Sequence, residues 1–423
     1  MTDFRRRILI FTIDTGFGHR SAANAISIAL AELFGEQCQV EIVNPAGDKR
    51  APAILRETQS DYDRMVRQWP QAYKLGFKLS NDPIPMAVVE RALTVMLYTL
   101  ISDTLRSYRP DALIVTMPIY LAPLSAVMNM QGWEFPVLTV ITDLTNVHRQ
   151  WFSDGSDLLM VPTQEVYDQA MKFGFAPERV KITGIPVNPR LSQQSTDRQM
   201  LRGSLGWRQD ITTVLIVGSK RVKNLTGVIH LLNHSGLAIQ LAIVAGGDVD
   251  LYSWLERQAW HLPVHYYNYV QNMPDLMLAS DCLMSKAGGL IVSESLACGL
   301  PLLLIDVTPG QEEGNAKYVI ERGAGELASE PEMAQEVLCH WLLDDCHLLR
   351  ERAQKAGTLG RPRAAYEIAE ICWQAIGEEW GHPRGLTAQA RRKLRELLRN
   401  FGIQTESDLR GESIPDRGKS GLR

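Results

Sequence analysis

The chain has 423 residues, of which 45% are hydrophobic and 22% charged, and this is typical of a globular protein with two or three domains. Its formal net charge of -4 and pI of about 6.2 give no general attraction for nucleic acid, so we expect no nucleic-acid partner. The six cysteines lack short paired spacings, and neither a signal peptide nor a bilayer-spanning stretch is visible. These features predict a cytoplasmic protein that spans no membrane.

Short apolar runs alternate with longer helical patterns along the whole chain. In the first half they predict strands at 7–13, 38–43, 112–117, 136–142, 158–162 and 181–186. After a polar break at 190–199, strands are predicted at 212–218, 239–246, 264–270, 281–286 and 301–306. Near-continuous hydrophobic strands between helices are typical of parallel sheets covered on both faces. The fold class is therefore α/β, with two doubly wound, Rossmann-like domains facing across a ligand cleft.

The same alternation predicts the domain boundaries. Residues 1–190 form the first domain and 206–360 the second, 361–380 form a helix that packs on the body, and 381–423 form a basic amphipathic segment with a disordered end. In this last segment, one side of a helix carries Leu394, Leu397, Leu398 and Phe401. Two interpretations stay open for it: a solvated helix packed loosely on the body, or attachment to a membrane surface.

The first motif with chemical potential is Gly-Phe-Gly-His at 16–19, where a buried strand turns into a helix. The first N–H groups of a helix lack intrahelical partners, and the helix dipole makes this end positive. A positive helix end disfavours imidazolium, so His19 should be neutral and able to take a proton from a hydroxyl. The alternative is a histidine that only caps the turn.

Two further glycine turns follow strands of the second half. Gly288 and Gly289 precede a helix and have the pattern of a diphosphate cradle, and Glu294 lies just over one turn along, where it can bind a ribose diol. In the next turn, Gln311, Glu312 and Glu313 are suited to gripping sugar hydroxyls. The alternatives are a solvated helix glutamate in the first case and carboxylates that complement a helix dipole in the second.

Other candidate sites are weaker. Asp143, His148 and Trp151 follow a buried strand, and the indole suits either a sugar ring, a lipid-borne group or plain packing. Asp248 and Asp250 form the Asp-x-Asp pattern of metal-dependent sugar transferases, but their place before a helix favours N-capping. The Cys-His pairs at 339–340 and 346–347 are too far apart for usual zinc spacing, so we expect no metal.

Together, the stretches GFGHRSAANAI, VITDLTNVHRQWF, ITGIPVNPRL, QNMPDLMLASDCLMSKAGGLIVSESLACGLPLLLI and PGQEEGNAKYV resemble the monogalactosyldiacylglycerol synthase and processive diacylglycerol glucosyltransferase family. This family has the GT-B fold and is also similar to the peptidoglycan GlcNAc transferase that makes lipid II. The resemblance covers residues 7–380 approximately, with the motifs in the family's order. It implies a UDP-sugar substrate in the second domain, a lipid acceptor in the first, and no cofactor.

The resemblance also implies roles for individual residues. It makes His19 the catalytic base, and it gives donor binding to Gly218, Lys220, Gly288, Gly289, Glu294, Gln311, Glu312 and Asn315. On the acceptor side it places Gly18, Asp143, His148 and Trp151. The chain departs from the family pattern at Phe17, which interrupts a glycine run, at Met117, and around Gly218, where Lys220, Arg221 and Lys223 replace glycines with charge.

The implied function is transfer of a hexose, with inversion, to a lipid acceptor such as diacylglycerol by a glycolipid-forming enzyme on the inner face of the cytoplasmic membrane. The stretch from Tyr62 to Lys78 interleaves aromatic and cationic residues, which suits docking on a membrane surface, although core packing of the aromatics is the alternative. Two other functions stay open: UDP-GlcNAc-type transfer to a polyprenyl-linked or other acceptor, and a non-catalytic nucleotide-sugar-binding module.

Overall fold

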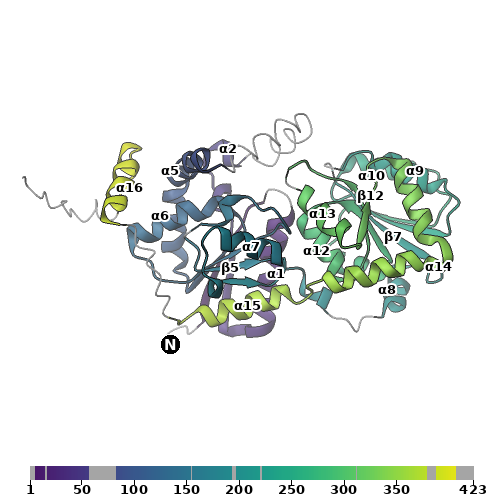
Figure 1. Ribbon diagram of the computed structural model, residues 1–423, viewed down its shortest axis with the longest axis horizontal. Coiled ribbons are helices and arrows are strands. Elements are labelled where there is room, and N and C mark those ends of the chain that lie inside the picture. Colours follow the sequence, from purple (N-terminus) through teal and green to yellow (C-terminus); the bar gives the residue numbers. More distant parts are fainter. Residues whose placement is uncertain are drawn as a thin grey trace, which may run out of the picture.

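The computed structural model describes residues 5–14, 17–56, 82–153, 155–192, 197–219, 222–310, 312–378 and 387–405. The chain forms two lobes that lie side by side, each built on a six-stranded parallel sheet with helices on both faces (Figure 1). This is the α/β architecture expected from the alternation of apolar runs and helical patterns. Within the described residues, no helix is both long enough and apolar enough to cross a membrane.

The first sheet has the strand order β2-β1-β3-β4-β5-β6. Its strands are β1 (Arg6–Phe11), β2 (Cys38–Val43), β3 (Ala112–Val115), β4 (Val137–Val140), β5 (Leu158–Val161) and β6 (Val180–Ile182). The helices around it are α1 (Phe17–Phe34), α2 (Ala53–Arg56), α5 (Pro83–Tyr108), α6 (Leu121–Gln131) and α7 (Gln164–Lys172). Alternate residues of β1 supply two cores: Leu9 and Phe11 pack with α5 and α6, while Ile8 and Ile10 pack with α1.

The second sheet has the order β12-β11-β10-β7-β8-β9. Its strands are β7 (Thr212–Val217), β8 (Ile239–Val244), β9 (Val264–Tyr267), β10 (Cys282–Lys286), β11 (Leu302–Asp306) and β12 (Gly325–Leu327). Its helices are α8 (Arg198–Leu205), α9 (Leu225–Asn233), α10 (Val249–Glu256), α11 (Met273–Ala279), α12 (Gly289–Ala297), α13 (Glu313–Glu321) and α14 (Pro331–Leu359). Strand β12 was not expected from the sequence. Short 3-10 helices precede the second lobe along the chain, at Gly35–Gln37, Pro45–Gly47, Pro118–Tyr120, Arg149–Trp151, Pro177–Arg179 and Pro189–Ser192.

The chain returns to the first lobe after α14, as Figure 1 shows, and α15 (Ala364–Ala375) packs there against α1. Trp373 fixes this helix, because its indole stacks on Phe34 with ring centroids 4.0 Å apart. The guanidinium of Arg6 lies 4.1 Å from the centre of the same indole and donates a 2.7 Å hydrogen bond to the Trp373 carbonyl. The two lobes are therefore joined by two crossings of the chain.

The tail helix α16 (Ala388–Asn400) lies beside α6 at the far end of the first lobe (Figure 1). Leu398 is fully buried in the core around α5 and α6, and Leu394 packs against it, whereas Phe401 is 64% exposed. The apolar side of the tail helix thus packs on the protein body, which agrees with the interpretation of a solvated helix packed on the body. The arginines and lysine at 391–393 point to solvent.

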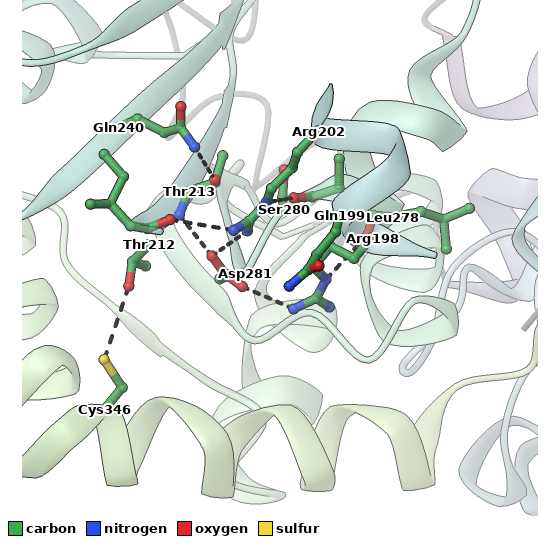
Figure 2. Close-up of polar contacts among 12 residues, drawn as sticks. Arg198, Gln199, Arg202, Thr212, Thr213, Gln240, Leu278, Ser280, Asp281 and Cys346 are labelled. Atoms are coloured by element: carbon green, nitrogen blue, oxygen red, sulfur yellow. Dashed lines mark hydrogen bonds and ion pairs between the residues drawn. The ribbon is translucent and has the colours of Figure 1, made fainter. Parts of the chain in front are cut away.

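A polar network anchors α8, the first helix of the second lobe, to its sheet (Figure 2). The Asp281 carboxylate accepts hydrogen bonds from Arg202 Nη2 (2.6 Å), Arg198 Nη1 (2.9 Å) and the Thr213 backbone N–H (2.7 Å). Arg202 also donates to the Ala279 carbonyl (2.8 Å). Since the Arg202 side chain is only 7% exposed, its charge depends on these partners.

Candidate active site

The strand orders locate the places where a ligand can bind. In an open parallel sheet, ligands bind at the carboxyl ends of the strands, at the point where the strand order reverses. That point lies between β1 and β3 in the first sheet and between β7 and β10 in the second. His19 follows β1 and Thr116 follows β3, whereas Gly218 follows β7 and Gly288 follows β10. Both sets of candidate residues therefore occupy switch points.

The imidazole of His19 has a fixed orientation. Its Nδ1 lies 2.7 Å from the Thr116 carbonyl oxygen and 3.1 Å from Thr142 Oγ1. A carbonyl can only accept a hydrogen bond, so Nδ1 carries the hydrogen and Nε2 is left as the proton acceptor. Burial lowers the pKa of His19 to about 4, against a smaller opposite effect of the Thr116 carbonyl, so the ring is neutral near pH 7.

The turn at Gly288 and Gly289 lies against the first lobe. A Cβ on Gly289 would be 2.4 Å from the Thr142 carbonyl oxygen, so no larger residue fits there without movement. A Cβ on Gly18, next to His19, would be 3.9 Å from Leu290 Cβ, which brings the beginnings of α1 and α12 close together. No side chain caps the amino end of α12, so its first N–H groups are available to an anion.

Glu294 lies on α12, one and a half turns from Gly289, and is half-buried. Among the described residues, its carboxyl group has no hydrogen-bond or ion-pair partner. Burial raises the pKa of Glu294 to about 8. A half-buried carboxyl without a protein partner is suited to an external hydrogen-bond donor such as a ribose hydroxyl.

Glu312 is buried at the start of α13 and pairs with Lys286, the last residue of β10. Its Oε2 accepts a hydrogen bond of 2.9 Å from the Thr308 backbone N–H. Burial favours the neutral acid, but the charge and hydrogen bond of Lys286 together with hydrogen bonds from Thr308 outweigh it, so the pKa of Glu312 is lowered. Gln311, its predicted partner in gripping the sugar, lies outside the described residues.

Asn315 of α13 is fully buried between the lobes. Its Oδ1 accepts a hydrogen bond from the Leu144 backbone N–H (2.9 Å), and its Nδ2 donates to the Ala287 carbonyl (3.1 Å). Asp143, next to Leu144, has its pKa raised to about 6 by burial and by the nearby charge of Glu312, while hydrogen bonding to Asn315 and the charge of Lys286 oppose the rise. The sequence placed Asn315 in donor binding, but here both of its polar atoms contact protein backbone.

His148 and Trp151 lie in the segment that follows β4 in the first lobe. His148 Nδ1 accepts a hydrogen bond from the Gln150 backbone N–H (3.3 Å) at the start of the 3-10 helix Arg149–Trp151. Trp151 is 2% exposed and packs in the core beside β5, with its ring centroid 6.3 Å from that of His19. The indole thus forms one wall of the His19 environment from the protein interior.

Gly218 directly follows β7 and lies in a crowded position. A Cβ there would be 2.6 Å from Leu225 Cδ2 and 2.9 Å from Leu251 Cδ2. Tight packing at the switch point therefore explains why a glycine occupies position 218. Lys220 and Arg221 lie outside the described residues, and the Lys223 backbone N–H donates to Asp306 Oδ2 at 3.2 Å.

Asp248, one of the residues that suggested metal binding, has a structural role in α10. Asp248 caps α10, because its Oδ1 accepts from the backbone N–H groups of Asp250 (3.2 Å) and Leu251 (3.3 Å). In the described part of the chain, no group of three or more histidine, cysteine, aspartate or glutamate side chains is arranged to hold a metal ion. The expectation that the protein uses no metal or cofactor stays a prediction.

Sequence reasoning missed Thr116, Thr142 and Lys286, which orient His19 and Glu312. Each lies at the carboxyl end of a strand or within two residues after it, and this position was the only available signal. A threonine or lysine at a strand end is common, so their roles emerge only once the strand order of each sheet is known.

Known proteins resemble this chain over both lobes. Residues 19–187 match the family model of monogalactosyldiacylglycerol (MGDG) synthase, and residues 213–365 match that of the glycosyltransferase family 28 C-terminal domain. Curated relatives include the probable monogalactosyldiacylglycerol synthase 2, chloroplastic, of Oryza sativa subsp. japonica, which is 28% identical over 86% of this chain and 80% of the relative. Monogalactosyldiacylglycerol synthase 2, chloroplastic, of Arabidopsis thaliana is 29% identical over the same shares.

Solved structures share the fold. MurG of Acinetobacter baumannii superposes with a TM-score of 0.56 at 15% identity, covering 87% of this chain and 99% of that one. The calicheamicin glycosyltransferase CalG4 gives a TM-score of 0.54 at 14% identity, covering 88% and 100%. These similarities show that the two lobes form a GT-B fold, as predicted.

The comparisons correct the predicted location. The relatives from rice and Arabidopsis are described as chloroplastic. This contradicts a cytoplasmic protein at the inner face of the cytoplasmic membrane, and that prediction is wrong. Cysteine spacing and the lack of a visible signal peptide report on redox state and secretion, and they do not distinguish between compartments that are both reducing.

The two family models follow one another in the order of the two lobes and together account for most of the chain between residues 19 and 365. The curated relatives extend this similarity over 375 residues. The first lobe therefore matches the monogalactosyldiacylglycerol synthase family, the second lobe matches the glycosyltransferase family 28 C-terminal domain, and the chain is a UDP-sugar-dependent glycosyltransferase with the GT-B fold.

Proposed function

We propose that the protein transfers a hexose from a UDP-sugar to diacylglycerol, with inversion at the anomeric carbon, and so synthesises a glycolipid. The observation that carries this proposal is the juxtaposition of a neutral, oriented His19 with the uncapped amino end of α12. The names of the curated relatives support galactose as the sugar and diacylglycerol as the acceptor. The similarity to MurG concerns the fold alone, so nothing specific favours a polyprenyl-linked acceptor.

The proposed chemistry is a direct displacement. The acceptor hydroxyl oxygen attacks the anomeric carbon while His19 Nε2 takes the hydroxyl proton. The bond between the anomeric carbon and the diphosphate oxygen breaks, and UDP leaves with the bonding electron pair. Because the Thr116 carbonyl keeps the hydrogen on Nδ1, Nε2 starts the reaction unprotonated, as a general base must.

The donor would lie on the second lobe. The N–H groups at the start of α12 would stabilise the charge that develops on the departing diphosphate, which is preorganised electrostatic catalysis. Glu294 would accept hydrogen bonds from the ribose hydroxyls, and Glu312, held by Lys286, would accept from the sugar. The Glu294 carboxyl group has no protein partner among the residues that the structure describes, whereas both carboxylate oxygens of Glu312 already have one, Oε1 with Lys286 and Oε2 with the Thr308 N–H.

A lipid acceptor would reach the first lobe from a membrane surface. The exposed side chains Val88, Val89 and Met96 recur along one side of α5, and Val88 is 62% exposed. This helix follows the stretch from Tyr62 to Lys78, which lies outside the described residues. Flotation with liposomes of neutral or anionic lipid tests the contact, since recovery that is equal with and without liposomes would contradict it.

The function is tested by mixing the purified protein with diacylglycerol and either UDP-galactose or UDP-glucose and following UDP release and glycolipid formation. We expect turnover that requires the lipid. His19→Ala should lower it about 10²–10⁴-fold, the usual contribution of a general base, while the Kd for UDP is unchanged. His340→Ala, which changes an exposed histidine of α14 in the second lobe, is the control and should keep most of the activity. UDP release that is independent of lipid, or a His19→Ala variant with the wild-type rate, would contradict the proposal.

A further inference from the structure

The two lobes touch through loop 142–145 of the first lobe, which lies against the amino ends of α12 and α13. A Cβ on Gly314 would be only 2.4 Å from Thr145 Oγ1 and 2.9 Å from the Thr145 carbonyl oxygen. Gly289 makes the equally close approach to Thr142 described above. Glycine at both positions allows backbone of one lobe to contact backbone of the other.

Asn315 is the polar connection at this contact. Its Oδ1 accepts a hydrogen bond from the Leu144 N–H of the first lobe, and its Nδ2 donates one to the Ala287 carbonyl of the second lobe. Leu144 is also tied to its own lobe, because its carbonyl accepts a 2.7 Å hydrogen bond from Thr163 Oγ1. Loop 142–145 is therefore hydrogen-bonded both to its own lobe, through Thr163, and to the second lobe, through the buried side-chain amide of Asn315.

The loop also contacts the proposed base. Thr142 Oγ1 lies 3.1 Å from His19 Nδ1, two residues from the N–H that Asn315 holds. On the other side, Asn315 binds the carbonyl of the residue that directly precedes the turn Gly288–Gly289. One short path of contacts thus links the predicted diphosphate turn to the imidazole that faces it.

We propose that Asn315 is a positioning residue, which by joining Leu144 to Ala287 aligns His19 of the acceptor lobe with the donor-binding turn of the other lobe. This inference rests on the proposed function of His19. It assigns Asn315 an effect on the rate of the transfer step, whereas the resemblance to the family implied a contact with the donor. A side chain that is fully buried with both polar atoms engaged acts through its neighbours, and misplacement by about 1 Å can lower a rate about 10²-fold.

The test uses Asn315→Ala and a matched control, Asn233→Ala. Asn233 is likewise buried and also joins two segments, donating to the Ala259 carbonyl (2.7 Å) and accepting from the His261 N–H (2.8 Å), but within the second lobe. We expect Asn315→Ala to lower kcat about 10–100-fold with the Kd for UDP changed less than about threefold. Asn233→Ala should lower stability without this loss of kcat. A loss confined to UDP affinity, or an equal loss of kcat in both variants, would overturn the proposal.

A second variant separates positioning from folding. Gly314→Ala introduces a methyl group against Thr145 and should move the lobes apart while leaving Asn315 in place. We expect it to reproduce the fall in kcat, and an unchanged kcat would contradict the coupling.

A measurement that needs no turnover distinguishes this inference from the proposed function. NMR titration of histidine-labelled protein reports the pKa of His19, which burial holds at about 4. Its pKa should rise towards the ordinary value near 6.5 in Asn315→Ala and in Gly314→Ala, because the ring gains solvent, and should stay low in Asn233→Ala. If wild-type protein lacks transferase activity but this pattern holds, the assigned reaction fails and the alignment stands. An unshifted His19 in both lobe-contact variants would overturn the alignment.

Discussion

His19 shows how two neighbours can fix the state of a base. Without the Thr116 carbonyl, either ring nitrogen could carry the hydrogen, and the nitrogen facing outward would be the acceptor only part of the time. Burial then keeps the ring neutral at physiological pH. A base with a pKa near 4 is weaker than one near 7, so the positioning of the two substrates must supply much of the rate enhancement.

Glu294 provides a test of the nucleotide site that does not depend on turnover. Because its pKa is raised to about 8, the side chain is mostly protonated at pH 7 in the free protein. Ribose hydroxyls that donate hydrogen bonds favour the carboxylate and lower the pKa, so UDP binding should release about one proton. Calorimetry in buffers of different ionisation enthalpy measures this number.

The control for proton release is Glu294→Gln, which preserves the shape of the side chain and cannot titrate. Its binding enthalpy should be the same in every buffer. Equal proton release by the wild-type protein and this variant would assign the proton to another group and remove Glu294 from the ribose site.

At the level of single residues, the sequence predicted the position of His19 well and its partners poorly. A histidine after a strand and a glycine turn is a local pattern, and it fixes the start of a helix. Thr116 and Thr142 are 97 and 123 residues away from His19 along the chain, so their contacts follow from strand order, which the sequence does not state directly.

At the level of elements, hydrophobic patterning was sufficient for most of the fold. The predicted strands appear at the expected places because a parallel sheet covered on both faces leaves almost no polar position in its strands. Strand β12 was missed because Gly-Glu-Leu is short and has one hydrophobic residue, which is too little for a pattern. The long helix α14 contains a break at Leu343–Cys346, where Asp344, Asp345 and Cys346 have left-handed backbone angles.

The network around Asp281 gives a prediction for the stability of the second lobe. Asp281→Asn keeps the shape of the side chain but leaves the buried guanidinium of Arg202 without a counter-charge. We expect the free energy of unfolding to fall by about 2–3 kcal/mol, less than for a fully buried pair because Asp281 is 20% exposed. Urea denaturation measures the change. Asp210→Asn, which breaks the exposed pair with Arg208, should leave the midpoint unchanged, and equal effects of the two variants would contradict the account.

For the whole molecule, the sequence predicted two lobes and a site between them, but not how the lobes meet. The contact depends on Gly289 and Gly314, which have no side chain to keep the lobes apart. In the sequence alone, they look like ordinary glycines of a turn and a helix. The buried Asn315 likewise reads as a polar residue near a helix start until its two partners on different lobes are seen. Contacts between separately folded sheets have no periodicity that patterning can detect.

The central claim is that a nucleotide sugar lies between the start of α12 and His19, and a crystal structure with bound UDP tests it most directly. The account predicts the diphosphate on the N–H groups that follow Gly288, the ribose hydroxyls within hydrogen-bond distance of the Glu294 carboxylate, and His19 Nε2 facing the departing end of the diphosphate. UDP bound elsewhere on the second lobe, with Glu294 still without a partner, would contradict it.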